Sequence, residues 1–148
     1  MRSSSRRRIP HFLTAIMLGT AALPFAVVLA DQTTAVDRAA SIYYRHIASR
    51  GYDTLRNEDS DVLDPGRSMT YNVSLYGGVS YILFAAGDSS ISDLDIYLYD
   101  ENDNLIARDT ATDNYPVVEV TPRWTGPFRL QIKNYAGRRG WYHMGIAY

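Results

Sequence analysis

The sequence contains no cysteine. Disulfides, thiol nucleophiles and cysteine-ligated metal centres are therefore excluded, and the fold must depend on its own core. Histidine is scarce as well, and beyond the first 30 residues only His46 and His143 are present. The sequence also lacks the HExxH and GxSxG patterns and a glycine-rich phosphate-binding loop. Because no complete catalytic set is present, we expect the protein not to be an enzyme.

The first 30 residues differ in composition from the rest of the chain. Four arginines precede an uncharged run over residues 12–29, which ends in small residues at Val28 and Ala30. This pattern predicts a cleaved secretory signal peptide. A membrane anchor is the alternative, because the run approaches the roughly 18 apolar residues that a span requires. Gly19 and Pro24 interrupt the run and favour cleavage.

Cleavage after Ala30 leaves a mature chain of residues 31–148, which we expect to be secreted or periplasmic, with no stable membrane span. Without the four leader arginines, 11 basic residues remain against 16 acidic ones, and the net charge becomes −5. Nucleic-acid binding requires a basic surface, so we expect no nucleic-acid partner. A chain of this length is sufficient for one domain that folds without disulfides.

The pattern over residues 31–51 predicts an N-terminal helix, running from about residue 33 to 50. Thr34 and Asp37 resemble an N-terminal capping box, and Gly51 suits the left-handed position that ends many helices. One apolar stripe is formed by Val36, Ala40, Tyr43 and Ile47. We expect this stripe to dock on the protein's own domain. A helical arm that binds a partner is the alternative.

From residue 52 to 148 the apolar period changes from 3.6 to 2. The predicted strands are residues 69–75, 79–86, 93–99, 105–109, 116–121, 128–133 and 142–146. Asn102 and Asp103 are expected in a tight hairpin turn, because both tolerate positive φ. Short strands with turn signals at this spacing predict an all-β domain, an antiparallel β-sandwich of about seven to eight strands.

Residues 66–148 resemble the bacterial pre-peptidase C-terminal domain. The resemblance is carried by Asp93-Leu94-Asp95-Ile96, Asp109, the apolar segment 117–120 and Gly126-Pro127-Phe128. The family resemblance implies a jelly-roll-like sandwich that is non-catalytic and is linked to secretion, to attachment and sometimes to calcium. The helix lies outside the matching region, so the chain looks like a small stand-alone exported form. Family members with cysteines near the GDSSISD loop differ from this chain, which has none.

Asp93 and Asp95 alternate with apolar residues and therefore share one face of their predicted strand. Two like charges so close become favourable when a hard cation binds between them, and calcium takes six to eight oxygen ligands. The predicted calcium ligands are Asp93, Asp95, Asp109, Asp88 and Asp113, with Asp109 the expected third carboxylate. The alternative is that these aspartates only cap turns and face solvent.

Aromatic and basic residues form the second group of candidate binding residues. Tyr97 and Tyr99 continue the face that carries Asp93 and Asp95, and they are the predicted ligand platform. Trp124 and Arg129 belong to a second predicted surface, together with Lys133, Arg138, Arg139 and Trp141. Ordinary outward charges on sandwich strands are the alternative interpretation of that surface.

The sequence as a whole predicts a non-catalytic, exported binding or structural module. Its expected partner is a protein or a polysaccharide of the envelope or the extracellular matrix. One alternative is an inhibitor, or a secretion or folding partner, of an exported protease. A further alternative is a hydrolase that uses Asp93 and Asp95.

Overall fold

The computed structural model describes residues 23–52 and 54–148. Most of the predicted signal peptide, residues 1–22, lies outside the described residues, so cleavage stays a prediction. Within the described ranges, no helix is long and apolar enough to cross a membrane.

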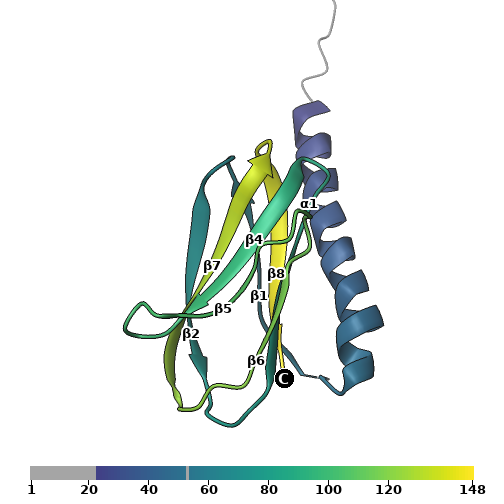
Figure 1. Ribbon diagram of the computed structural model, residues 1–148. Coiled ribbons are helices and arrows are strands. Elements are labelled where there is room, and N and C mark those ends of the chain that lie inside the picture. The colour runs from purple at the N-terminus through teal and green to yellow at the C-terminus, as the bar shows by residue number, and fades with distance from the viewer. Residues whose placement is uncertain (1–22, 53) are drawn as a thin grey trace, which may run out of the picture.

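Eight antiparallel strands form two four-stranded sheets (Figure 1). They are β1 (Leu55–Leu63), β2 (Ser68–Leu75), β3 (Tyr81–Gly87), β4 (Ile91–Tyr99), β5 (Leu105–Asp109), β6 (Val117–Val120), β7 (Gly126–Gly137) and β8 (Gly140–Ala147). The sheet orders are β1-β8-β3-β6 and β2-β7-β4-β5. The strands therefore pair as nested hairpins, β4 with β5, β3 with β6, β2 with β7 and β1 with β8. This is the strand order of a jelly roll, and the predicted β-sandwich is confirmed.

The inner faces of the two sheets form the main core. Strand β4 shows why the alternating sequence predicts this arrangement. Leu94, Ile96 and Leu98 are completely buried between the sheets, as expected from their period of 2. Asn102 and Asp103 lie in the hairpin that follows, as predicted, and Asp103 has a φ of 64°. Asn102 does not have positive φ, and residues 100–104 connect the paired Tyr99 and Leu105, so the loop is longer than the expected tight turn.

The helical segment comprises α1 (Leu23–Ile42), a π-helical turn η1 (Tyr43–Ile47) and a 3₁₀ turn η2 (Ala48–Arg50). Gly51 ends it with a φ of 92°, as predicted. The predicted capping box is wrong. The helix already begins before Thr34, which therefore lies inside it and cannot occupy the N-cap position.

The helix docks on the outer face of the β1-β8-β3-β6 sheet, which confirms the docked interpretation. Tyr43 and Ile47 are buried against Phe84 of β3, as expected. In the preceding turns, however, Ala35 and Ala39 face the sheet, and the predicted Val36 and Ala40 are only half-buried. Because β3 is covered on both faces, all seven of its residues are buried.

Strand β1 is absent from the sequence-based prediction. Its sequence, LRNEDSDVL, is mostly polar and does not alternate. A register shift between Arg56 and Asp59, with Asn57 at a φ of 51°, also interrupts its pairing with β8. On this edge strand the backbone N–H groups of Ser60 and Val62 donate to the carboxylates of the preceding aspartates. An edge strand of this kind carries little apolar signal.

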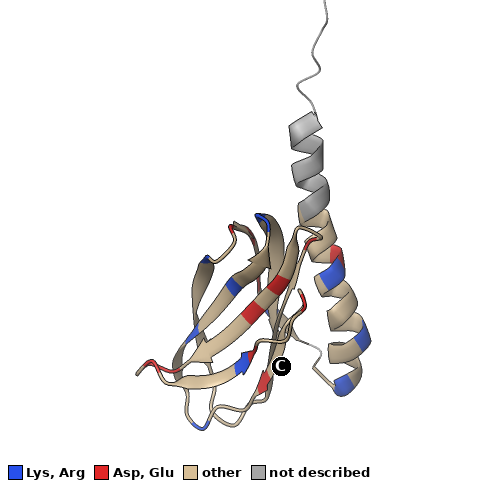
Figure 2. Cartoon of the chain, turned by 45° about the horizontal axis from the view of Figure 1, so that its top comes forward, with Lys and Arg blue, Asp and Glu red and all other residues tan. Residues whose placement is uncertain are grey.

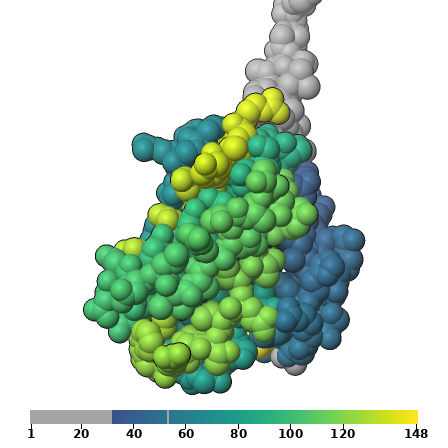
Figure 3. Space-filling view, in the orientation of Figure 1, coloured from purple at the N-terminus to yellow at the C-terminus, as the bar shows by residue number. Residues whose placement is uncertain are grey.

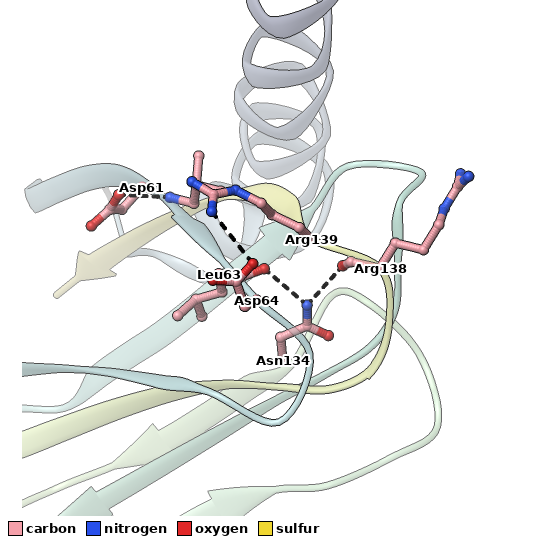
Figure 4. Close-up of polar contacts among 7 residues, drawn as sticks. Asp61, Leu63, Asp64, Asn134, Arg138 and Arg139 are labelled. Carbon is pink, nitrogen blue, oxygen red and sulfur yellow. Dashed lines mark hydrogen bonds and ion pairs between the residues drawn. The ribbon is translucent and has the colours of Figure 1, made fainter.

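A buried amide joins the loops at one end of the sandwich (Figure 4). The side-chain nitrogen of Asn134 donates to the carbonyls of Leu63, at 3.1 Å, and Arg138, at 2.9 Å. Arg139 and Asp64 form an ion pair of 3.4 Å beside it. These contacts connect the end of β1 to the β7–β8 turn.

Candidate binding face

The helix covers one sheet, whereas among the described residues no element covers the outer face of the β2-β7-β4-β5 sheet (Figure 1). We call the outward side chains of β4 and β7 the open face: Asp93, Asp95, Tyr97, Tyr99, Arg129, Gln131, Lys133 and Tyr135. Figure 2 shows acidic residues along β4 and basic residues on the neighbouring strand and on the helix. The open face therefore carries both signs of charge.

Asp93 and Asp95 line a pocket of about 400 Å³ on this face, together with Tyr97, Thr110 and Tyr135. Both carboxylates are buried, with exposed fractions of 7% for Asp93 and 3% for Asp95. The sequence correctly places the two on one face of β4, but outward alternation suggests solvated side chains, not buried ones.

Asp93 is the unusual member of this acidic pair. Its Oδ1 atom is buried and has no hydrogen-bond partner among the described residues. Burial, in the first place, raises the pKa of its carboxyl group, and the nearby charges of Asp95 and Asp113 raise it further. A buried acceptor without a donor is rare in a native fold, which makes Asp93 a candidate residue of the functional site.

Asp95 is held by a neighbour on its own strand. The hydroxyl of Tyr97 donates to its Oδ2 atom at 2.8 Å. Burial and this hydrogen bond to a carboxylate raise the pKa of Tyr97 to about 12. Tyr97 therefore stays protonated at neutral pH and remains a donor to Asp95.

The aromatic part of the open face is continuous with the acidic pocket. The rings of Tyr97 and Tyr99 stack with centroids 6.3 Å apart. The guanidinium of Arg129 lies over Tyr99 at 4.9 Å and forms an ion pair of 2.5 Å with Asp103. The structure thus brings four predicted binding residues of β4 and the predicted Arg129 together on one surface.

The other predicted calcium ligands are engaged in loop contacts. Asp109 lies opposite Ile96, not opposite Asp95, and its oxygens accept from the backbone N–H groups of Ala111 and Val117. Its side chain therefore points away from the open face. Asp88 accepts from the N–H groups of Ser90 and Trp141. Asp113 accepts from that of Tyr115.

Within the part of the chain that the structure describes, no three His, Cys, Asp or Glu residues converge as a metal would require. Asp93 and Asp95 supply carboxylates, while calcium requires six to eight oxygens. Backbone carbonyls, threonine hydroxyls or water would have to provide the remainder. Calcium at these residues stays a prediction.

Trp124 lies in a different place from the predicted ligand platform. Its ring stacks on Phe128 at 5.7 Å, and its indole N–H donates to Glu101. It lines a separate pocket with Leu105 and Ile106. Trp124 therefore does not belong to the open face.

The sequence analysis did not identify one pair of residues that could act as a nucleophile and a base. Ser60 of β1 and His143 of β8 are cross-strand partners, with Ser60 Oγ at 2.7 Å from His143 Nδ1. Glu58 lies 3.3 Å from the other ring nitrogen. The order Ser–His–Glu resembles a hydrolytic triad. However, the N–H of Ser60 is bound by the Asp59 carboxylate, which would repel a developing oxyanion at this position.

A groove of about 700 Å³ separates the helix from the β5–β6 connection (Figure 3). Arg45 and His46 contribute from the helix, and Asp113 and Tyr115 contribute from the connection. Both acidic side chains in the groove, Asp109 and Asp113, accept hydrogen bonds from backbone N–H groups of the same connection. The groove follows from docking of a helix beside a loop, and among the described residues it holds no unpaired buried side-chain atom.

No family model matches the chain, and neither does any curated protein. The resemblance to the pre-peptidase C-terminal domain therefore stays a prediction. The chain is similar in structure to the crystal structure of Aeromonas hydrophila PliG, a periplasmic lysozyme inhibitor of g-type lysozyme. The TM-score is 0.47 and the identity is 9%, over 62% of this chain and 83% of that chain. A similarity this low carries no argument about function.

Proposed function

We propose that the protein is an exported, non-catalytic module that binds a protein partner through the open face. The carrying observation is the contrast between the two sheets. A docked helix covers the outer face of one sheet, whereas the other presents a pair of stacked tyrosines, an arginine and an acidic pocket. Tyrosine and arginine are the side chains that dominate binding energy at protein interfaces.

A protein ligand fits this face better than a polysaccharide does. Sugar rings stack on exposed aromatic faces, but the rings of Tyr97 and Tyr99 stack on each other, and Arg129 lies over Tyr99. A surface of mixed charge with a small acidic pocket is suited to specific side chains of a partner. The narrower possibility, an inhibitor or a folding partner of an exported enzyme, is one form of this proposal.

Partner capture with paired variants tests the proposal. The immobilised protein is incubated with an envelope extract, and captured proteins are identified by mass spectrometry. The double change Tyr99→Ala and Arg129→Ala should reduce capture of a specific protein at least tenfold, because it removes the central contacts of the face. Tyr44→Ala is the matched control, since Tyr44 is 72% exposed on the helix. Exported peptidases and g-type lysozyme can be assayed for inhibition in parallel.

Two outcomes would contradict the proposal. One is that the double change at Tyr99 and Arg129 and the control change at Tyr44 reduce capture of the partner equally. The other is turnover of glycosides that Asp93→Asn abolishes, since the raised pKa of Asp93 beside Asp95 also suits a general acid in a hydrolase.

A further inference from the structure

The side chain of Asp93 has a buried oxygen without a hydrogen-bond partner in the described part of the chain. A buried acceptor without a donor destabilises the fold, because its desolvation is not compensated by a hydrogen bond. Among the described residues only Asp93 Oδ1 and Asn134 Oδ1 are side-chain atoms of this kind. Asn134 at least uses its amide nitrogen to join two loops. Asp93 instead lines a pocket that is open to a ligand.

The pocket holds acidic charge that no neighbouring cation neutralises. Lys133, the only lysine of the chain, lies directly opposite Asp95 on β7. Its ammonium nevertheless lies 5.0 Å from the centroid of the Tyr135 ring, and the described residues show no ion pair between Lys133 and either carboxylate. Arg108 lines the same pocket, also without an ion pair in the described part of the chain. The two carboxylates are therefore available to a cation from outside.

We propose that the Asp93–Asp95 pocket receives the primary ammonium of a lysine side chain from the protein partner. This inference rests on the proposed function and names the group that the open face recognises. An ammonium carries three donors, which the carboxylates of Asp93 and Asp95 and a threonine hydroxyl of the pocket wall can accept. Tyr135, which already has one ammonium over its ring, stands at the rim.

The geometry favours an ammonium over the two other common cations. A guanidinium prefers a carboxylate with both oxygens accessible, but Tyr97 already occupies Oδ2 of Asp95, and Oδ1 of Asp93 is buried. Calcium requires six to eight oxygens, and Asp109, Asp88 and Asp113 are engaged in loop contacts. A lysine ammonium is a compact charge whose three donors can rotate, so it needs fewer ligands than calcium and tolerates their irregular placement.

The test is an amide NMR titration of the purified protein with Nα-acetyl-lysine methylamide. We expect saturable shifts at residues 93–97 and 110–112. Nα-acetyl-norleucine methylamide has a similar chain without the charge and should bind at least tenfold more weakly. Asp93→Asn should weaken lysine-analogue binding at least tenfold. Asp103→Asn, which removes one negative charge from the hairpin outside the pocket, should leave it unchanged.

Three results would overturn the inference. The first is equal binding of the lysine and norleucine analogues, which needs no variant and is independent of folding. The second is equal or tighter binding of Nα-acetyl-arginine methylamide. The third is the same set of shifts produced by calcium chloride at lower concentration, which would identify a calcium site. If the partner's capture depends on Tyr99 and Arg129 but the lysine analogue does not bind, only this inference fails.

Discussion

A carboxylate that is buried without a hydrogen bond destabilises the fold that contains it. Asp93 is in this position, and its pKa is raised mainly by burial and further by Asp95 and Asp113. The folded state thus holds the proton of Asp93 more tightly than the unfolded chain does. The resulting penalty is absent below the ordinary pKa of 3.8, grows as the pH rises through the raised pKa, and is constant above it.

Asp93→Asn should therefore stabilise the protein at pH 7, by about 1 kcal/mol, because an amide has no charge to desolvate. The gain should shrink as the pH falls and should vanish below the ordinary pKa of a carboxyl group. Urea unfolding at several pH values measures both quantities. A variant that is less stable than the wild type at pH 7 would contradict the explanation.

Asp100 is a control, because its pKa shift has the opposite direction to that of Asp93. Hydrogen bonds from the Asn104 side chain and from the backbone N–H groups of Asn102 and Asn104 hold the pKa of its carboxyl below the ordinary value. Its contribution to stability is present above the unfolded pKa and is lost as the pH falls through the folded one. Asp100→Asn should accordingly destabilise the protein at neutral pH and have little effect in acid.

At the residue scale, the sequence predicts which way a side chain points better than it predicts what the side chain meets. The alternation in β4 places Asp93 and Asp95 on one face, as the structure has them. The wall of the pocket around them includes Thr110, Thr112 and Tyr135, which lie on other segments of the chain. The position of Asp109 depends on a register irregularity between Leu98 and Tyr99, which no local pattern reveals.

The docked helix is the element whose contribution to stability can be tested most directly. Ile47 is 1% exposed and belongs to the cluster that joins the helix to β3 and β8. Ile47→Asp should lower the free energy of unfolding by about 3 kcal/mol, because it buries an unpaired charge. Thermal and urea unfolding measure the change.

His46→Asp is the control for that substitution, since His46 is exposed on the neighbouring position. It should change stability by less than about 1 kcal/mol, a cost that arises from a negative charge near the C-terminus of the helix. Equal unfolding curves for the wild type and Ile47→Asp would show that the helix is a free arm.

For the strands and the helix, the spacing of apolar residues in the sequence determines which elements can be predicted. Strands β2, β3, β4, β7 and β8 carry inward apolar residues and are found from the sequence. Strand β1 lies at a sheet edge and is polar from Arg56 to Asp61, so along most of its length its place depends on pairing with β8. Only its ends pack on apolar clusters, Leu55 beside the helix and Leu63 in the main core. The helix phase is set by the close approach of Ala35 and Ala39 to the sheet, which a count of large apolar residues does not detect.

For the whole molecule, the remaining prediction concerns export. N-terminal sequencing of protein recovered from the envelope or the medium should show a chain that begins at or near Asp31. The physical reason is the uncharged run that ends in small residues before that position. An intact Met1 on membrane-bound protein would show an anchored form instead.

The nested strand order has a kinetic consequence. Strand β8 lies between β1 and β3, so the β1-β8-β3-β6 sheet cannot be completed until this last strand has been synthesised. Leu55 at the start of the domain pairs with Ala147 near its end, a separation that gives a high contact order. Domains of high contact order fold slowly, because a long loop must close before the pairing is gained. A chain still under synthesis therefore cannot complete the β1-β8-β3-β6 sheet. This topology delays folding until the C-terminal strand has left the ribosome.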